Sequence, residues 1–336
     1  MLKYFIIALL SFQSFSDCIH EFQKTAEEIQ TLAKYQNVLF LNEDNQFINF
    51  HSGISLEKNR DYTIQVSHPK RLTESNKGYN DRYLEYYSYA HIQKFLSNQS
   101  SSLNNIGYSY KSIGKSVQGR NLYYVAPKKL SNKKKTILMF GRHHGDEGTA
   151  NWIIEGFVRK FIKDANFREK YQLVLYPMVN PDGAENHSRY NARRRDLNRV
   201  WHSNPEKSYD EVKVIQKHFL SQAGKADIML DMHGSFTEDF IYRVDRNFLS
   251  SDYYNMQQSF IDTLGALDPY QNGNFQISNG HKKMARIYFL KNFNINSLTH
   301  ETPRDIRRNG SRSIEDLNQQ GIALLETINK EVVVKK

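Results

Sequence analysis

From about residue 106 onward, short apolar runs alternate with amphipathic stretches of helical spacing. Four of the runs have the length and composition of buried strands: 136–140, 173–178, 227–232 and 295–299. Apolar residues recur at helical spacing in the segments between and after them: 152–162, 212–220 and 314–328. Strands bounded by helices are typical of α/β folds. We therefore predict a central sheet, mixed but mainly parallel, with helices flanking it.

Polar side chains gather where each of these predicted strands ends. They are His143, His144 and Glu147 after the first strand, Asn180 to Gly183 after the second, His233 after the third, and His300 and Glu301 after the fourth. In open α/β sheets, ligands bind beyond the carboxyl ends of the strands, near a switch in strand order. Four separate strand ends that carry such residues therefore indicate one shared pocket.

Three of these residues have the chemistry and spacing of a zinc site. His144 and Glu147 form an H-x-x-E motif, in which an imidazole and a carboxylate can face one point from a strand-to-helix turn. His233, in a D-x-H-G motif, would complete three protein ligands and leave a fourth position open, as a catalytic zinc ion requires. H-x-x-E alone occurs often by chance, but the two motifs together are much more specific. We predict one Zn²⁺ per chain, and we expect His143 to shape the strand end or orient its neighbours.

The order of these motifs resembles that of the zinc carboxypeptidases of the M14 (funnelin) family. The matching elements are G-x-S-x-x-G-R at 114–120, H-x-x-E at 144–147, N-P-D-G at 180–183, Arg189, D-L-N-R at 196–199, and the late His233 and Glu301. The resemblance covers roughly residues 83–330. It is specific because the order, the spacings and the strand context agree together.

The resemblance implies a role for each matching residue. His144, Glu147 and His233 would bind Zn²⁺, which polarises the scissile carbonyl and activates water. Glu301 would take the water proton and pass it to the leaving amine. The other roles concern the substrate: the developing oxyanion would face Arg189, and the terminal carboxylate would be held by Asn198 and Arg199.

Two positions depart from the digestive members of the family. Those enzymes have an Arg between the first two ligands, where this chain has Gly145-Asp146. They also place a mobile Tyr over the substrate, but the expected position here, near 275–276, holds Phe275 and Gln276. The D-L-N-R-x-W ending looks more like the cytosolic, deglutamylating branch of the family.

The preference for a terminal residue is set, in this family, by a segment that precedes the catalytic Glu. Here that segment, residues 280–286, reads G-H-K-K-M-A-R and contains no acidic residue. A cation turned inward from Lys282, Lys283 or Arg286 would favour Glu, Asp or the extra carboxylate of diaminopimelate, and we assign this role to Lys282. The alternative is that all three cations lie on the solvated face of a helix.

Four other features, in different parts of the chain, are interpreted from their local sequence. Arg193-Arg194-Arg195 is expected to be a solvated charge run, and Asp182 to fix a loop or to hydrogen-bond a metal-binding histidine. His300, next to Glu301 in an extended segment, should point to the opposite face. Residues 97–105 (SNQSSSLNN) are read as a polar loop.

The first residues have the pattern of a signal peptide. A short positive start is followed by the apolar run 5–12 (FIIALLSF), and small residues precede a cleavage site after Ser16. The run is shorter than the roughly 20 apolar residues that span a bilayer. A lipid on Cys18 is disfavoured because Asp17 precedes it. We therefore expect a secreted or periplasmic protein without a stable membrane anchor.

Residues 17–80 differ from the rest of the chain and are predicted to form a small N-terminal module or pro-like segment. A helical pattern at 21–35 is followed by three short apolar runs with strand composition, at 38–41, 47–50 and 62–66. Residues 70–82 are polar and rich in turn formers, which indicates a linker. The zinc carboxypeptidase domain is then expected to occupy residues 81–336.

Composition limits the class of protein without choosing a substrate. The chain has 46 Lys and Arg against 36 Asp and Glu, a formal charge of +10, and a single Cys that rules out an internal disulfide framework. The Lys residues are scattered, so no nucleic-acid partner is predicted, and we expect a monomer.

The leading hypothesis is a zinc carboxypeptidase that acts on a peptide with a free C-terminal carboxylate. The runner-up is a murein-peptide amidase or carboxypeptidase that cuts a bond to diaminopimelate. A third enzyme hypothesis is an aspartoacylase-type deacylase, although D-L-N-R and the N-P-D-G spacing favour a peptidase. The hypothesis of another class is a non-catalytic peptide-binding protein that kept the pocket.

Overall fold

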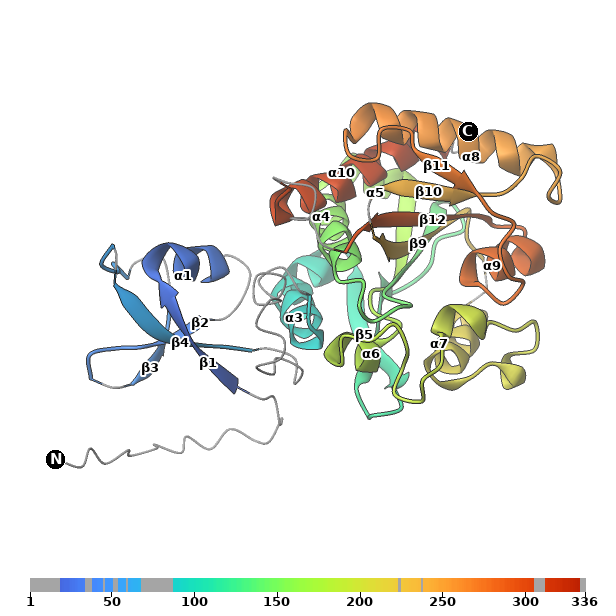
Figure 1. Ribbon diagram of the computed structural model, residues 1–336. Helices are drawn as coiled ribbons and strands as arrows, with labels where there is room; N and C mark the ends of the chain where they lie inside the picture. The colour runs from blue at the N-terminus through green and yellow to red at the C-terminus, as the bar shows by residue number, and fades with distance from the viewer. Residues whose placement is uncertain are drawn as a thin grey trace. The chain divides into compact units, whose positions relative to one another are not determined.

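The computed structural model (Figure 1) describes residues 19–33, 38–44, 46–50, 54–58, 60–67, 87–222, 225–236, 238–304 and 312–332. The predicted signal peptide, Cys18 and the predicted linker at 70–82 lie outside the described residues. The chain divides into two compact units, Met1–Thr73 and Glu74–Lys336, close to the predicted boundary at residue 80. No described helix has the length and apolar character needed to cross a membrane.

The smaller unit is an antiparallel sheet with one helix. Its elements are β1 (Ile19–Thr25), α1 (Ala26–Ala33), β2 (Val38–Leu41), β3 (Phe47–Asn49) and β4 (Asp61–Ser67), in the strand order β1-β4-β2-β3. Buried apolar side chains from α1, β2 and β4 form its core: Ile29, Val38, Phe40 and Ile64. The three predicted strands are confirmed. The predicted helix is wrong over Glu21–Thr25, because this backbone pairs with β4 along the full length of β1.

The larger unit contains an eight-stranded mixed sheet in the order β11-β10-β12-β9-β7-β8-β6-β5. Its strands are β5 (Tyr108–Lys115), β6 (Asn121–Pro127), β7 (Lys135–Gly141), β8 (Tyr171–Tyr176), β9 (Ile228–Ser235), β10 (Phe240–Arg243), β11 (Phe275–Ile277) and β12 (Asn296–Pro303). The four central strands β12, β9, β7 and β8 are parallel, and antiparallel pairs flank them. The predicted mixed, mainly parallel sheet is confirmed, and its central strands are the four predicted ones.

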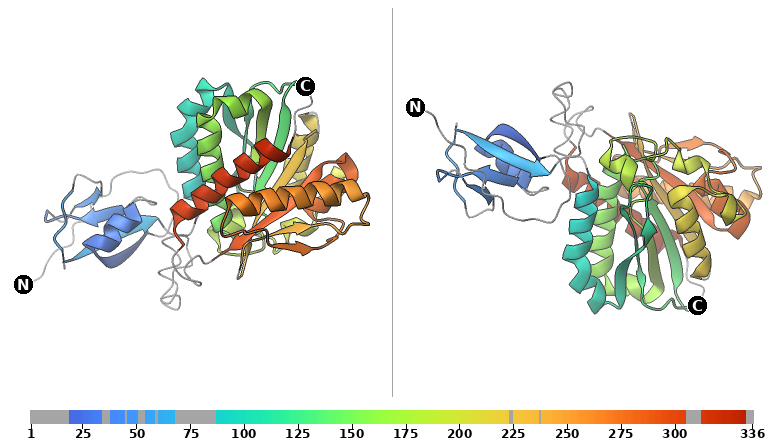
Figure 2. Two further views of the ribbon diagram at one scale, coloured as in Figure 1. Left: turned by 90° about the horizontal axis from the view of Figure 1, so that it is seen from above. Right: turned by 90° about the horizontal axis from the view of Figure 1, so that it is seen from below.

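Helices cover both faces of this sheet (Figures 1 and 2), as the uninterrupted apolar strands require. On one face lie α3 (Tyr89–Asn105), α4 (Thr149–Lys163), α8 (Ser251–Leu267) and α10 (Ile314–Glu331). On the other lie α7 (Asp210–Ser221) and α9 (Ala285–Phe293). The short helices α5 (Ala165–Lys170) and α6 (Pro181–Glu185) follow α4 and β8. A cluster of buried aromatic rings, including Phe140, Trp201, Tyr288 and Phe289, packs the face beneath α7 and α9.

The predicted polar loop at 97–105 is wrong, because α3 continues through it to Asn105. Ser88 caps the start of this helix by accepting a hydrogen bond from the backbone N–H of His91. Within the polar half, Leu103 is 1% exposed and anchors the last turn. Tertiary packing of a few apolar positions therefore outweighs the weak helix propensity of Ser and Asn.

Candidate metal centre and active site

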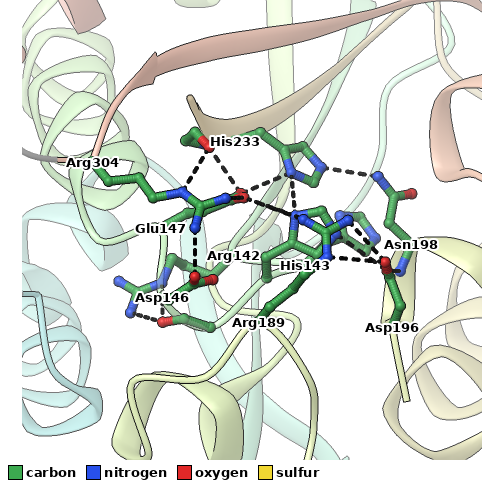
Figure 3. Close-up of polar contacts among 12 residues, drawn as sticks. Arg142, His143, Asp146, Glu147, Arg189, Asp196, Asn198, His233 and Arg304 are labelled. Atoms are coloured by element: carbon green, nitrogen blue, oxygen red, sulfur yellow. Dashed lines mark hydrogen bonds and ion pairs between the residues drawn. The ribbon is translucent and has the colours of Figure 1, made fainter. Parts of the chain in front are cut away.

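The predicted site residues meet at the carboxyl edge of the central parallel strands. His144 and Glu147 follow β7, whereas His233 belongs to β9 and Glu301 to the neighbouring strand β12. In the sheet register, Glu301 lies directly opposite His233. Figure 3 shows the polar side chains of this region converging from the different strand ends. All four residues line one cavity of about 490 Å³.

The turn after β7 is held by Arg142 and by close backbone contacts. Arg142 is fully buried, has a φ of 60°, and donates hydrogen bonds to the carbonyl oxygens of Tyr87 and Gly145. A Cβ atom on Gly145 would lie 2.0 Å from the backbone of Gly183. The turn that carries His144 therefore packs directly against the N-P-D-G segment, at a distance that only glycine allows.

The three predicted metal ligands form a compact set of donor atoms. Nδ1 of His144 lies 2.9 Å from Glu147 Oε1, and Nδ1 of His233 lies 2.9 Å from Glu147 Oε2. The two Nδ1 atoms are 3.1 Å apart. Zinc bonds of 2.0–2.1 Å in a tetrahedron place neighbouring ligand atoms about 3.3 Å apart. The spacing of the set therefore fits a single small cation.

In both histidines, the ring nitrogen that faces away from the ligand set, Nε2, contacts a carboxylate. Nε2 of His144 lies 3.2 Å from Asp196 Oδ1, and Nε2 of His233 lies 2.9 Å from Asp231 Oδ2. Each Nε2–H can therefore donate to a carboxylate, which leaves the lone pair of each Nδ1 facing the other ligands. Two lone pairs that face each other at 3.1 Å repel unless a proton or a cation lies between them, so the donor set also fits a metal ion by its chemistry.

The close packing of ionisable groups in the site shifts the pKa values of His233 and Glu147. Burial opposes a charge on His233, but Asp231 and Glu147 outweigh it and hold the pKa of His233 well above its ordinary value. Burial likewise opposes the ionised form of Glu147, but His144 and His233 hold its pKa well below the usual range. Both shifts show that the site attracts positive charge, which a bound cation would supply in place of the His233 proton.

Glu301 and Arg189 flank the ligand set within the same cavity. Burial raises the pKa of Glu301 to about 7, although His233 pulls it in the opposite direction. Nη1 of Arg189 lies 3.2 Å from His144 Nδ1, and Nη2 donates to Asp196 at 2.8 Å. The structure thus brings both predicted catalytic residues to the ligand set; their roles in turnover stay predictions.

Asn198 and Arg199, the two residues predicted to bind the terminal carboxylate of the substrate, differ in burial and in hydrogen-bond partners. Asn198 is buried, and its side-chain oxygen accepts the backbone N–H of Ala285 while its amide nitrogen lies 3.0 Å from His233 Nε2. Arg199 is exposed and lines the cavity, with Nη1 bonded to the carbonyl oxygen of Asn198. Arg199 therefore has donors available for a substrate carboxylate, whereas Asn198 also contacts the ligand His233.

In the segment 280–286, the cation that points into the protein is Arg286 and not Lys282, the residue we predicted. Lys282 is exposed and is absent from the cavity lining, so the structure does not place it where we expected. Arg286 is fully buried in the first turn of α9, and its Nη2 donates to the carbonyl oxygen of Ser278. Its Nε and Nη1 atoms have no hydrogen-bond partner in the described part of the chain. Lys282 is solvated because it precedes the helix, whereas Arg286 lies on the inner face.

Several residues of the site were not singled out from the sequence. Arg304, just after β12, donates to Glu147 Oε1 at 2.9 Å and to Asp146 at 2.5 Å. Tyr242, from β10, lines the cavity from a strand that sequence reasoning did not identify. Asp231 could have been found from the D-x-H spacing, because alternate residues of a strand share a face. Arg304 and Tyr242 carry no comparable local signal.

Two other expectations concern residues beside the site. Asp182 fixes a loop, as predicted: its carboxylate accepts from Ser116 Oγ, the Gln118 backbone and Arg120. The G-x-S-x-x-G-R motif therefore anchors the β5–β6 turn to α6. Arg193 and Arg194 are exposed, as expected for a solvated run, whereas Arg195 is partly buried. Arg193 and Arg195 both form ion pairs with the buried carboxylate of Asp210.

Comparison with known protein families shows which family the chain belongs to. A family model described as the succinylglutamate desuccinylase/aspartoacylase catalytic domain matches residues 133–303, just over half of the chain. The chain belongs to this zinc-carboxypeptidase-like (M14) family. The matched range begins just before β7 and ends with β12, so it contains every ligand and strand end of the site.

Relatives within the M14 family include mouse proteins of the cytosolic type. The chain is 21% identical over 265 residues to mouse cytosolic carboxypeptidase 2, a match that covers 72% of this chain and 31% of that protein. A shorter match to mouse cytosolic carboxypeptidase 1 is 36% identical over 76 residues, 21% of this chain and 6% of that protein. The chain thus spans less than a third of the length of these relatives.

Solved structures support the M14 fold over nearly the whole chain. The metallo-carboxypeptidase from Burkholderia cenocepacia has a TM-score of 0.65 and 19% identity, and the match covers 94% of this chain and 85% of that one. The Pseudomonas aeruginosa metallo-carboxypeptidase, in complex with (2-guanidinoethylmercapto)succinic acid, has a TM-score of 0.63, 19% identity, and coverage of 93% and 86%. These likenesses confirm the predicted fold class.

Proposed function

We propose that the protein is a zinc-dependent carboxypeptidase that removes one residue from a peptide with a free C-terminal carboxylate. The observation that carries this proposal is the convergence of His144, Glu147 and His233 with Glu301 in one cavity whose rim presents Arg199. The names of the relatives and structural neighbours agree with this activity. The presence of Glu301 and all three ligands argues against a non-catalytic binding protein.

The geometry suggests how the residues would divide the work. A zinc ion held by the three ligands would supply Lewis acidity toward the scissile carbonyl and its attacking water. Glu301, on the strand beside His233, would accept the proton of that water and deliver it to the leaving amine. Arg189 would stabilise negative charge on the carbonyl oxygen, and Arg199 would orient the substrate through its terminal carboxylate.

We further propose that the enzyme prefers an acidic terminal residue, and that Arg286 rather than Lys282 selects it. Arg286 does not itself line the cavity, but it is buried against Ser278, which does, and two of its guanidinium nitrogens lack a described partner. Thr299 Oγ1, on the cavity wall, also lacks a described partner. Burial lowers the pKa of Arg286 to about 10, although Asp231 opposes this shift, so the side chain stays charged at neutral pH. A buried cation without a partner favours a carboxylate that reaches it.

A matched pair of variants tests this preference. Arg286→Gln should lower kcat/KM for peptides ending in Glu by about 10–100-fold, the loss of a charge-assisted hydrogen bond, while peptides ending in Leu change far less. Lys282→Gln is the control, because Lys282 belongs to the same segment but is exposed, whereas Arg286 is buried. Equal losses for Glu and Leu, or a wild-type preference for terminal Arg or Phe, would refute the assignment.

The activity itself is tested by mass spectrometry of the products. The zinc-loaded protein is offered peptides with C-terminal acids, the same peptides amidated, and digested murein. We expect release of one residue from the acids and a kcat/KM about 10–100-fold lower for the amides, since Arg199 would lose a charge-assisted hydrogen bond. Equal cleavage of acid and amide would contradict a carboxypeptidase. Release of diaminopimelate from murein alone would identify the substrate as a cell-wall peptide.

A second candidate function is the deacylation of an N-acyl amino acid. The family model that matches residues 133–303 is described by two such enzymes, a desuccinylase and an aspartoacylase. A deacylase would cleave a single acylated amino acid and leave longer peptides intact. Adding N-acetyl-aspartate and N-succinyl-glutamate to the assay separates the two functions, because the carboxypeptidase should accept peptides far better than either compound.

We also propose that the protein is exported and acts as a monomer. Export rests on the apolar run at 5–12 and on the small residues Ser14 and Ser16, which precede the expected cleavage site. The mass of the N-terminal peptide from the native host tests it, and a retained Met1 would contradict it. Sedimentation velocity of the purified protein measures its mass in solution, and a mass of twice that of one chain would contradict a monomer.

A further inference from the structure

Four buried side chains form a continuous chain of polar contacts from the aromatic core to the metal-ligand set. Nε1 of Trp201 lies 3.2 Å from Nε2 of His143, and Nδ1 of His143 lies 2.6 Å from Oδ1 of Asp231. Oδ2 of Asp231 lies 2.9 Å from Nε2 of His233. Trp201, His143 and Asp231 are fully buried and His233 is 2% exposed, so water does not compete for these contacts.

The chemistry of the groups allows one arrangement of protons along this chain. An indole N–H can only donate, so Nε2 of His143 accepts, and neutral His143 must carry its proton on Nδ1 and donate to Asp231. Because Nε2 accepts from the indole, it holds no proton of its own, and the ring of His143 is neutral. An ionised Asp231 can only accept, so Nε2 of His233 donates to it. The amide nitrogen of Asn198, 3.0 Å from the same ring nitrogen, is also a donor, and it donates to Asp231 Oδ2 at 3.4 Å instead. The lone pair of His233 is then left on Nδ1, the atom that faces Glu147.

We propose that Trp201 and His143 are positioning residues that, through Asp231, fix the tautomer of His233 and aim its Nδ1 atom at the metal. The inference concerns the metal site of the proposed function but does not depend on which substrate that site accepts. His143 is adjacent to a ligand in the sequence, and the structure gives it a partner on each ring nitrogen.

The same geometry argues that His143 is not itself a metal ligand. His143, Asp231 and His233 have ligand atoms close enough together to hold an ion. However, the Trp201 indole occupies one nitrogen of His143, and the carboxylate of Asp231 occupies the other. The rings of His143 and His233 are also nearly parallel, 2° apart in plane and 5.6 Å between centroids. Trp201 itself is fixed by contacts with Phe140 and Phe289 in the core.

The first test needs no substitution. ¹⁵N NMR of the zinc-loaded protein with labelled histidines reports which ring nitrogen carries each proton, with His143→Asn and His233→Asn spectra used for assignment. We expect the proton of His143 on Nδ1 and that of His233 on Nε2. Trp201→Phe keeps the aromatic packing but removes the donor, so the His143 signals should shift toward a mixture of tautomers. A proton on Nε2 of His143 in the wild type, or no change in Trp201→Phe, would overturn the proposal.

The second test measures metal affinity by competition with a chelator, which is independent of any activity. His143→Phe removes both ring nitrogens, and we expect zinc binding to weaken by about 10–100-fold. His143→Asn retains an amide N–H near the Nδ1 position and should recover most of the affinity. His218→Phe, at a histidine that bonds Tyr176 outside this chain of contacts, is the control. Wild-type affinity in folded His143→Phe, or equal losses in the Phe and Asn variants, would overturn the proposal.

Discussion

Each histidine of the proposed metal centre is flanked by a carboxylate whose position follows from its backbone element. Asp231 precedes His233 by two residues on β9, whereas Asp196 lies in the turn that precedes Asn198 and Arg199. Asp196 also accepts hydrogen bonds from Arg189, so a single carboxylate holds the proposed ligand His144 and the proposed catalytic residue Arg189 together. At the scale of residues, the site is therefore a set of side chains whose rotamers are fixed by ion pairs before any substrate arrives.

Glu301→Gln tests the assignment of the general base. Glutamine keeps the shape of the side chain but cannot accept the water proton, so turnover should fall by about 10²-fold or more. Because Glu301 is not a ligand, the variant should retain its zinc, and metal analysis beside the kinetics separates the two effects. Near-normal turnover would mean that another group is the base.

The pKa of Glu301 gives a prediction for the metal-free protein. Burial raises this pKa to about 7, above the ordinary value of 4.5 that we assume for the unfolded chain. The folded state then binds more protons between pH 4.5 and 7, so this group makes the unfolding free energy fall as the pH rises through that range. ¹³C NMR of labelled Glu301 measures the pKa, and Glu301→Gln should remove this part of the pH dependence. Adding zinc should lower the pKa, and an unshifted value near 4.5 without metal would contradict the prediction.

At the scale of elements, the central strands and the order of motifs along them could be predicted from the sequence. Long apolar runs such as 136–140 and 173–178 are strong signals because both faces of β7 and β8 are buried. The edge strands could not be predicted in this way. All three residues of β11 are exposed, and β10 spans four residues, so neither has a clear apolar pattern.

The same distinction explains which site residues escaped prediction. Ligands that end predicted strands follow from the sheet, because parallel strands bring their carboxyl ends together. Arg304 contacts Asp146 across 158 positions of sequence, and no periodicity reports such a pair. Arg286 and Lys282 are both cations of one segment, and the inner face of α9 distinguishes them only once its start at Ala285 is known.

The crossing of α4 and α10 depends on two glycines. A Cβ atom on Gly321 would lie 2.1 Å from the carbonyl oxygen of Ile153, and one on Gly156 would lie 2.1 Å from that of Asn318. Gly321→Ala should therefore lower the unfolding free energy by about 1–3 kcal/mol, despite the better helix propensity of Ala. Urea denaturation measures this, with Gln319→Ala on the exposed side of α10 as control. A stabilised Gly321→Ala variant would contradict the close approach of the two backbones.

At the scale of the whole molecule, the two compact units differ in what they contain. The larger unit, Glu74–Lys336, holds the proposed metal ligands, the cavity and the matched family region. The smaller unit, Met1–Thr73, has its own antiparallel sheet and its own buried side chains. A ligand that binds one unit stabilises that unit by mass action, and it stabilises the other only through energetic coupling between them.

Calorimetry with and without zinc should therefore resolve the two units. Zinc at a hundred times its Kd stabilises the unit that binds it by about 2.7 kcal/mol, which raises the Tm of a unit of this size by roughly 5–10 °C. We expect the transition of Glu74–Lys336 to shift and that of Met1–Thr73 to stay within about 1 °C. His233→Ala should abolish the shift, because it removes a ligand from the metal set. Equal shifts of both transitions in the wild type would show that the units unfold as one, and an unchanged shift in His233→Ala would remove that residue from the ligand set.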